Sequence, residues 1–401
     1  MGDVLSKAGY ATGYWGKWGY GGSSSRKSPT LDNIQTLPTS HGYQYVVAEL
    51  HHVRAHTFFQ PTLWNAPAKP GTKGGLELKP NSMAKYTNNK AYPNYPASQN
   101  HPDYPKVAYC DDVYAFAALD FVRRQAVRYN KSREPFFGLF AAQIPHAPFA
   151  EVQKLPDWDQ AYKNKLYFPK LSAQSKQWCA MVTRIDAHFG NLLDALDDPN
   201  GDGDKSDSVA QDTLVVFQSD NGGPRGSNRE ELDANGGLLG SKGSIFEGGI
   251  RVPTIAWWPG AVKAGSADDH QWYFGDCMAT FAELAGTKVP DDIDSDSFLP
   301  TLRGNPPAKQ WARKSRLYWE FLERGSAQAV RFGKWKAIRQ PMFTGPIQLY
   351  DLSFDHEEKR DHAKSRPDLV KHAANLLDQC HEPDPNWKTP RRKSPLKKSP
   401  P

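Results

Sequence analysis

The sequence of 401 residues predicts an α/β fold, in which helices cover a mainly parallel sheet, followed by a smaller α+β domain. Predicted strands alternate with predicted helices over most of the chain. These strands are apolar along their whole length, which is typical of strands buried on both faces. After residue 304 the pattern changes to short strands joined by turns and one helix. With 38% hydrophobic and 23% charged residues, the chain has the composition of a folded protein.

The elements of the large domain, residues 1–304, are predicted from apolar spacing and from Gly and Pro boundaries. Apolar residues recur at helical spacing around Tyr114 and around Met181, and a dense apolar run precedes Pro145. Residues 40–108 have no strong period, so we expect a long excursion over the surface. The predicted order is the end of a helix at 3–10, a strand at 10–18, a helix at 111–128, a strand at 135–143, a helix at 178–196, strands at 213–217 and 251–258, and a helix at 276–286.

The small domain, residues 305–385, is predicted to be an antiparallel sheet with one helix. Its short apolar runs are separated by turns such as the one at Gly333 and Lys334. The predicted strands are 317–321, 329–332, 335–339 and 347–352, and the predicted helix is 368–380. Residues 386–401 are basic and of low complexity, so we expect a disordered tail.

The net charge of +6 comes from this tail. Residues 388–401 contain six basic residues and no acidic one, which leaves 44 basic and 44 acidic residues in the rest of the chain. A nucleic-acid-binding fold needs a basic stripe on its body, so the sequence argues against one, apart from contact of the tail with a polyanion. The four cysteines lie far apart, which excludes a zinc ribbon. No membrane span is predicted, and nothing indicates an oligomeric state.

Two predicted strands end in polar clusters, at the place where α/β sheets bind ligands. The first cluster is Pro-His-Ala-Pro around His146, and the second is Ser-Asp-Asn-Gly-Gly with Asp220 and Asn221. Carboxylate and amide oxygens without neighbouring His or Cys suit a hard cation such as Ca²⁺ better than zinc. A plain turn is the alternative interpretation of Asp-Asn-Gly-Gly.

Two lysines stand between glycines. Lys17 lies in Gly-Lys-Trp-Gly, and Lys242 lies in Gly-Ser-Lys-Gly-Ser, which continues to Glu-Gly-Gly-Ile-Arg-Val-Pro. Glycine neighbours let an anion approach such a lysine closely. A solvated surface lysine is the alternative interpretation of each.

In this order, the clusters resemble the sulfatase family, the formylglycine-dependent type I enzymes, in their arylsulfatase-like form. The resemblance covers nearly the whole chain, including Met-Val-Thr-Arg-Ile-Asp from Met181, Leu-Tyr-Trp-Glu-Phe from Leu317 and Leu-Tyr-Asp-Leu-Ser-Phe-Asp from Leu349. It implies an alkaline-phosphatase-like α/β domain that hydrolyses the sulfate ester of a small molecule or glycan at a Ca²⁺ site. It also implies export to the periplasm or the outside of the cell.

The resemblance assigns a role to each matching residue. Asp220 and Asn221 match calcium ligands of the family, an incomplete set for one Ca²⁺, and Lys17 and Lys242 match its catalytic, sulfate-binding lysines. His146 matches the catalytic histidine near the bridging ester oxygen. Cations neutralise the charge on the sulfuryl oxygens, and a protonated histidine can protonate the departing alkoxide.

The sequence departs from the family at two places. No Cys or Ser starts the C-x-P-x-R or S-x-P-x-R motif that becomes the formylglycine nucleophile. We therefore expect a sulfatase chain that lacks the N-terminal segment and is inactive as it stands. Gly19 occupies the place of a histidine found in many sulfatases. Members with glycine there also resemble the stretch around His56, which suggests that His56 binds near the sulfate; a surface histidine is the alternative.

Two other functions stay open. The chain could be a non-catalytic, anion-binding degenerate sulfatase that keeps the pocket without the nucleophile. A metal-dependent phosphodiesterase or phosphatase of the same superfamily is a further alternative, although Asn221 stands where a zinc enzyme more naturally has histidine. Sulfatase-like coding sequence upstream of Met1 would distinguish the sulfatase from the degenerate binding module.

Overall fold

The structure, a computed structural model, describes residues 1–21, 29–32, 34, 36–84, 103–156, 158–304, 316–386 and 389. The chain divides into two compact units. The first comprises Met1–Leu214, Trp258–Ala261 and Phe281–Val289, and the second comprises Val215–Trp257, Val262–Thr280 and Pro290–Pro401. Each unit is therefore assembled from stretches that are separated in the sequence.

A five-stranded mixed sheet forms the centre of the first unit, in the order β4-β3-β2-β1-β5. Strands β2, β1 and β5 run parallel, β3 pairs antiparallel with β2, and β4 pairs antiparallel with β3. The bounds are β1 Ala11–Gly21, β2 Tyr45–His51, β3 Thr62–Ala66, β4 Glu77–Pro80 and β5 Phe136–Ala141.

The expectation of a surface excursion at residues 40–108 was wrong, because this stretch supplies three strands of the sheet. The apolar run of β2 pairs with β1 and buries Val46, Ala48 and Leu50 in a core cluster. Histidines and prolines around this run interrupt the apolar pattern, so the sequence did not predict the strand.

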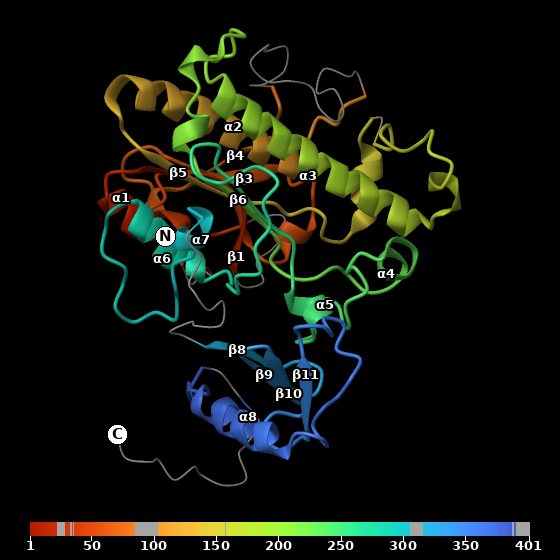
Figure 1. The fold of residues 1–401 in the computed structure, drawn as a ribbon. Helices are drawn as coiled ribbons and strands as arrows, with labels where there is room; N and C mark the ends of the chain where they lie inside the picture. Colours follow the sequence, from red (N-terminus) through yellow and green to blue (C-terminus); the bar gives the residue numbers. More distant parts are fainter. Residues whose placement is uncertain are drawn as a thin grey trace. The chain divides into compact units, whose positions relative to one another are not determined.

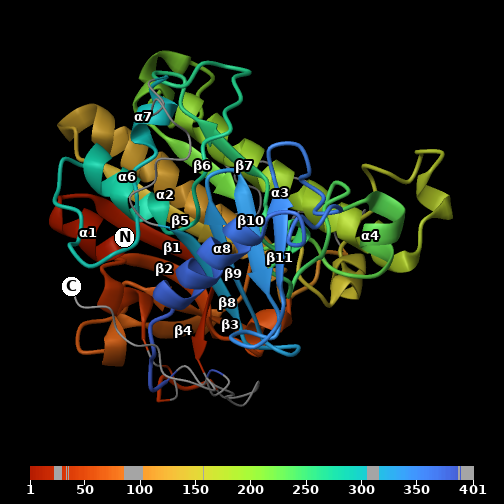
Figure 2. The ribbon, with the colours of Figure 1, turned by 60° about the horizontal axis from the view of Figure 1, so that its bottom comes forward.

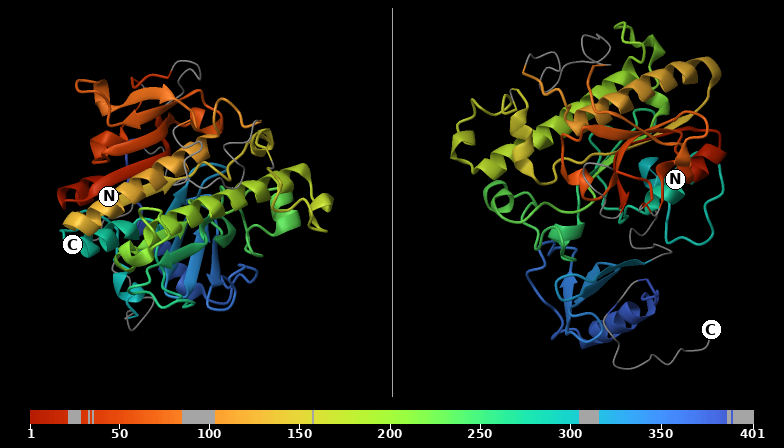
Figure 3. Two further views of the ribbon diagram at one scale, coloured as in Figure 1. Left: turned by 90° about the horizontal axis from the view of Figure 1, so that it is seen from above. Right: turned by 180° about the vertical axis from the view of Figure 1, so that it is seen from behind.

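Two long helices pack in layers beside the sheet. Helix α2 (Cys110–Ser132) packs on β1 and β5, and α3 (Ala173–Asp197) packs along α2 (Figure 1; Figure 3, left). Both helices confirm the prediction from apolar spacing. A buried ion pair joins them, in which the Arg184 guanidinium donates from two nitrogens to the Asp112 carboxylate. The remaining helical segments are α1 Gly2–Lys7 and the 3₁₀ turns η1 Pro38–His41, η2 Arg54–His56, η3 Lys73–Gly75, η4 Phe149–Lys154, η5 Phe168–Lys170, η6 Lys205–Asp207 and η7 Ala210–Asp212.

The second unit starts with a two-stranded sheet of β6 (Val215–Gln218) and β7 (Thr254–Trp257). The sequence correctly predicted both strands. However, it predicted them to be buried strands of the parallel sheet. They pair antiparallel with each other, and Ile255 is 57% exposed. The short helices of this unit are α4 Ser227–Leu232, α5 Glu247–Ile250 and α7 Leu299–Leu302, while α6 Asp276–Leu284 is divided between the two units after Thr280.

A four-stranded antiparallel sheet and one helix complete the second unit, as predicted. The strands are β8 Leu317–Phe321, β9 Ala327–Phe332, β10 Trp335–Arg339 and β11 Ile347–Asp351, in the order β11-β10-β9-β8. Helix α8 (Pro367–Gln379) lies across this sheet (Figure 2) and buries Ala373, Leu376 and Leu377 against it. The opposite face packs on Ile245.

Two expectations about the C-terminal part remain predictions. The predicted boundary at residue 304 is followed by residues 305–315, which lie outside the described residues, and nearly all of the predicted tail lies outside them as well. Among the described residues, every helix is too short or too polar to span a bilayer.

Candidate functional site

The first group of candidate residues lies in the first unit, at the carboxyl ends of parallel strands β1 and β5. Lys17 follows Gly16 in β1, where Gly16 pairs with Ala141 of β5. Gly16 has a φ of +109°, and a β-carbon there would lie 1.9 Å from the Ala141 carbonyl oxygen. Only glycine therefore lets the strands meet so closely immediately before the lysine.

Lys17, His56 and His146 are brought together in this unit. The Lys17 ammonium nitrogen lies 3.5 Å from Nε2 of His56. The His56 ring stacks on that of His146, with centroids 4.4 Å apart and planes 3° from parallel. The His52 ring meets the His56 ring edge-on, with centroids 4.5 Å apart. His56 is therefore a member of this cluster.

His146 is oriented by its own loop. Its Nδ1–H donates to the carbonyl oxygen of Ala147 at 2.6 Å, and its backbone N–H donates to the carbonyl of Gln143. The neutral ring therefore carries its proton on Nδ1, so that Nε2 is the nitrogen that gains or gives up a proton.

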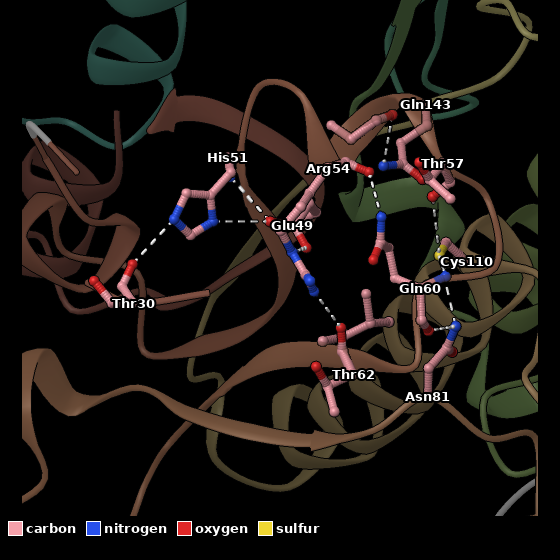
Figure 4. Close-up of polar contacts among 12 residues, drawn as sticks. Thr30, Glu49, His51, Arg54, Thr57, Gln60, Thr62, Asn81, Cys110 and Gln143 are labelled. Carbon is pink, nitrogen blue, oxygen red and sulfur yellow. Dashed lines mark hydrogen bonds and ion pairs between the residues drawn. The ribbon is translucent and has the colours of Figure 1, made fainter. Parts of the chain in front are cut away.

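A buried ionic network holds the turn that carries His56 (Figure 4). The Glu49 carboxylate accepts from Nε of Arg54 at 2.9 Å and from both the backbone N–H and the ring of His51. All three side chains are fully buried. Arg54 also donates to the carbonyl of Thr62 in β3, so the turn after β2 is fastened to the neighbouring strand. Removing either charge would leave the other buried without its partner.

Two buried glutamines fix the backbone of the same turn. Gln60 donates to the carbonyl of Arg54 at 2.9 Å, and Gln143 donates to the carbonyl of Ala55 at 3.0 Å (Figure 4). Because Gln143 also begins the loop of His146, it links the supports of His56 and His146 directly.

Asp111 of α2 anchors the start of the His146 loop. Its Oδ1 accepts from the backbone N–H groups of Gln143 and Ile144 at 2.8 and 3.3 Å. Its Oδ2 is buried and accepts no hydrogen bond within the described part of the chain. Burial raises the pKa of Asp111 to about 7, so this carboxyl group is half-protonated near neutral pH.

The second group of candidate residues lies in the second unit, directly after β6. Asp220 is exposed, and Asn221 donates through Nδ2 to the carbonyl of Gly222 at 3.1 Å. In the described part of the chain, nothing donates to the Asp220 carboxylate or to Oδ1 of Asn221. These open oxygen donors fit a share of a Ca²⁺ coordination sphere. The described residues contain no group of three His, Cys, Asp or Glu that could hold a metal alone.

Glycines bring the Asp220 loop against α5 and the loop of Lys242. The Gly222 N–H donates to the carbonyl of Gly249 at 2.9 Å, and the Lys242 N–H donates to the carbonyl of Gly223 at 3.0 Å. A β-carbon on Gly222 would lie 1.9 Å from the carbonyl oxygen of Gly248. The Gly-Gly pairs after Asn221 and after Glu247 therefore serve close backbone packing.

A second buried ionic network supports this packing. Lys336 of β10 is fully buried and contacts Glu247 at 2.8 Å and Glu358 at 2.9 Å. Glu358 also accepts from the backbone N–H of Glu247 at 2.6 Å. Burial opposes the ionisation of Glu247, but Lys336 and neighbouring arginines outweigh it and lower its pKa. Burial raises the pKa of Glu358. The C-terminal sheet thus holds the start of α5 in place.

Asp220, Asn221 and Lys242 open into one cavity of about 1260 Å³ within the second unit. Its wall combines basic, acidic and aromatic side chains, with Trp272 and Trp319 among the aromatic ones. A space of this volume accommodates a sugar-sized ligand.

Sequence reasoning missed the residues that support the site. Glu49, Arg54 and Gln143 look like ordinary polar residues in the sequence, because their burial appears only after folding. The polar residues Glu49, His51 and His52 at the end of an apolar run were the one available signal.

Two family models match this chain. Residues 1–287 match the family model described as Sulfatase, and residues 239–382 match the one described as N-sulphoglucosamine sulphohydrolase, C-terminal.

Several curated relatives are sulfatases. The human N-acetylgalactosamine-6-sulfatase is 33% identical over 228 residues, which covers 53% of this chain and 38% of that protein. A sulfatase of Formosa agariphila is 35% identical over 201 residues, 49% of this chain and 35% of that protein. The chain thus spans little more than a third of these two relatives. The N-acetylgalactosamine-6-O-sulfatase of Bacteroides thetaiotaomicron is 25% identical over 423 residues, 94% of this chain and 76% of that protein.

Solved structures share the fold over almost the whole chain. The crystal structure of Ps i-CgsB in complex with k-i-k-neocarrahexaose matches with a TM-score of 0.64 and 25% identity, and it covers 94% of this chain and 73% of that one.

Proposed function

The chain belongs to the sulfatase family, and from this membership we propose that its protein hydrolyses sulfate esters carried by sugars. The observation that carries the proposal is the contact of Lys17, His56 and His146 at the carboxyl ends of β1 and β5. The names of the relatives, two of which are N-acetylgalactosamine 6-sulfatases, and the carrageenan oligosaccharide bound to Ps i-CgsB support a sulfated glycan as the substrate.

In this proposal the two lysines bind sulfate oxygens. Lys17 and Lys242 each place an ammonium group beside glycine-rich backbone, where an anion can approach. His146 delivers a proton through Nε2 to the bridging ester oxygen as the alkoxide departs. A β-carbon at Gly19 would lie 3.3 Å from Cε of Lys17, while His56 contacts Nζ of the same lysine. We therefore propose that His56 supplies the imidazole that Gly19 does not.

A Ca²⁺ ion would be held in part by Asp220 and Asn221, whose oxygens face the cavity that Lys242 lines. When bound, the ion neutralises negative charge on the sulfate ester. The residues of this chain orient the ester and carry the proton.

Hydrolysis of a sulfate ester also requires a nucleophile. The printed sequence contains no Cys or Ser that starts C-x-P-x-R or S-x-P-x-R. We therefore propose that residues 1–401 alone bind sulfate esters without hydrolysing them, and that a nucleophile outside them is required for turnover. A degenerate sulfatase that only binds anions is the second candidate function, because the same observation favours it.

The test compares residues 1–401 with the native protein purified from its source cells. We expect residues 1–401 to bind N-acetylgalactosamine 6-sulfate in calorimetry, to lose at least tenfold in affinity in Lys17→Gln, and to release no sulfate. The native protein should release sulfate from the same compound but not phosphate from the 6-phosphate. No binding by residues 1–401 would overturn the proposed site. Binding without hydrolysis by the native protein would favour the degenerate sulfatase.

A further inference from the structure

We propose that Arg324 and Arg225 bind a second anionic group of the substrate, so that the natural substrate is a saccharide with at least two anionic groups. This inference rests on the proposed function, in which Lys242 binds the sulfate that is cleaved. Both arginines line the same cavity as Lys242 in the second unit.

Arg324 lies directly over the loop of Lys242. Its Nη1 donates to the carbonyl oxygens of Lys242 and Gly243 at 3.5 and 3.4 Å. Gly243 has a φ of +79°, and a β-carbon there would lie 2.8 Å from the same Nη1. The glycine therefore leaves the space that the guanidinium occupies. The two hydrogen bonds are long, so they engage only part of the donor capacity of the guanidinium.

The turn that carries Arg324 has an unfavourable backbone conformation. Arg324, Gly325 and Ser326 have successive φ values of +55°, +92° and +61°, although only glycine adopts this region freely. Ser326 is buried, and its hydroxyl accepts from the backbone N–H of Met342 at 3.2 Å, which fixes the turn. Backbone strain of this kind concentrates at functional sites, because the rest of the fold must compensate for it.

Arg225 reaches the Lys242 loop from another segment. Its Nε donates to the hydroxyl of Ser241, the residue before Lys242, at 3.1 Å. Within the described residues, neither Arg225 nor Arg324 forms an ion pair with a carboxylate, although Asp268, Asp269 and Glu323 also line the cavity. By contrast, Arg251 in the same wall lies 3.7 Å from a carboxylate oxygen of Glu247.

The positive charge of Lys242 has two arginine neighbours on the cavity wall, which also carries carboxyl groups such as Asp268 and Glu323. Two guanidinium groups that bracket the lysine supply two further positive charges and several N–H donors. Guanidinium groups bind sulfate and carboxylate groups through paired hydrogen bonds, so each is suited to an additional anion rather than to a sugar hydroxyl.

A competing explanation is that Arg324 only fastens the Lys242 loop to the turn after β8. This explanation predicts an equal effect on every ligand that uses Lys242. Anion recognition predicts a loss of affinity only for ligands with a second anionic group. It also predicts that replacing the arginine with lysine keeps part of the preference for these ligands.

The experiment measures the affinity of residues 1–401 for three compounds by calorimetry. They are N-acetylgalactosamine 6-sulfate, its 4,6-disulfate, and a 6-sulfated disaccharide that carries a uronic acid. We expect at least one of the two dianions to bind ten- to a hundredfold more tightly than the monosulfate, and the tighter one identifies the second anion. Arg324→Gln and Arg225→Gln should each remove most of this preference and leave the monosulfate affinity unchanged. Arg324→Lys should keep part of it.

Arg366→Gln is the matched control, because it removes one positive charge from the same unit at a surface pair with Asp368. It should leave all three affinities unchanged. Equal binding of the three compounds by the unsubstituted chain would overturn the inference and leave the proposed function intact. An equal loss for all compounds in Arg324→Gln would show that the arginine only holds the loop. Failure of the unsubstituted chain to bind any of them would overturn the proposed function itself.

Discussion

The candidate side chains of the first unit contact one another, whereas those of the second unit are not joined by hydrogen bonds within the described residues. Lys17, His56 and His146 form a continuous set of contacts. Within the described residues, no hydrogen bond joins the side chains of Asp220 and Asn221 to that of Lys242, although all three open into one cavity. The first group is therefore held together by contacts among its own side chains.

Both groups nevertheless rest on buried ionic networks, and the networks differ in range. Glu49 and Arg54 are five residues apart, so the support of His56 is local. Lys336 and Glu247 are 89 residues apart, so the support of the Asp220 loop depends on the C-terminal sheet. The imidazole cluster can therefore form with the sheet of the first unit, whereas the Asp220 loop requires the C-terminal sheet.

The largest effect is expected from Arg54→Met. This change leaves Glu49 fully buried beside His51 without its strongest partner, so the free energy of unfolding should fall by about 3–5 kcal/mol. Urea denaturation of residues 1–401 measures it. Lys73→Met is the control, because its ion pair with Asp32 is exposed and should contribute little to the free energy of unfolding. Similar losses in the two variants would contradict the assigned role of the buried network.

Lys336→Met should destabilise the second unit to a similar extent, about 3–5 kcal/mol, because Glu247 and Glu358 would remain buried together. The loss should be larger at pH 8 than at pH 5, since the two carboxyl groups can protonate at the lower pH. Measuring the free energy of unfolding at pH 5 and at pH 8 tests this prediction. Lys359→Met, which breaks an exposed pair with Glu357 in the same unit, is the control. A loss independent of pH would exclude the ionic explanation.

Asp111→Asn should remove a pH dependence of stability. Asp111 has a folded pKa of about 7 against an ordinary value of 3.8. Between these values the unfolded chain releases the proton first, so the free energy of unfolding should fall by up to about 4 kcal/mol as the pH rises from 4 to 7. Asparagine keeps the acceptor for the N–H groups of Gln143 and Ile144. Denaturation curves at several pH values should therefore be flatter in the variant; parallel curves would refute the raised pKa.

Asp220→Ala has the smallest expected effect. If Asp220 supplies one oxygen of an incomplete calcium site, Ca²⁺ affinity should fall at least tenfold, about 1.4 kcal/mol. Calorimetry with Ca²⁺ alone measures this in residues 1–401. Asp268→Ala removes another carboxylate from the same cavity and should leave the affinity unchanged. An equal fall in Ca²⁺ affinity in both variants would indicate a nonspecific effect of charge.

The sequence predicted those parts of the fold in which one pattern dominates. Helices α2, α3 and α8 and strands β8 to β11 carry clear apolar periods, and the structure contains all of them. Strands β2 to β4 were missed, because His, Pro and Asn interrupt their short apolar runs. The antiparallel pairing of β6 with β7 was also missed, because an apolar run does not specify the direction of its partner.

Of the candidate site, the sequence predicted individual residues but not their supports. Lys17, His146 and Lys242 stand in recognisable glycine- or proline-rich segments. Glu49 and Gln143 could not be identified, since a buried carboxylate or amide has the same one-dimensional surroundings as an exposed one. Their importance depends on tertiary contacts with Arg54 and Ala55, which no local pattern encodes.

The division of the first unit among three stretches of chain has a consequence for synthesis on the ribosome. Phe137 of β5 packs its ring against Phe281, 5.8 Å away, and Phe281–Val289 belongs to the first unit. The nascent chain therefore cannot complete this unit until residue 289 has left the exit tunnel, after more than half of the chain has been translated. A truncation at residue 214 would keep the whole five-stranded sheet but leave Phe137 without this neighbour, so excised pieces should aggregate more readily than the intact chain.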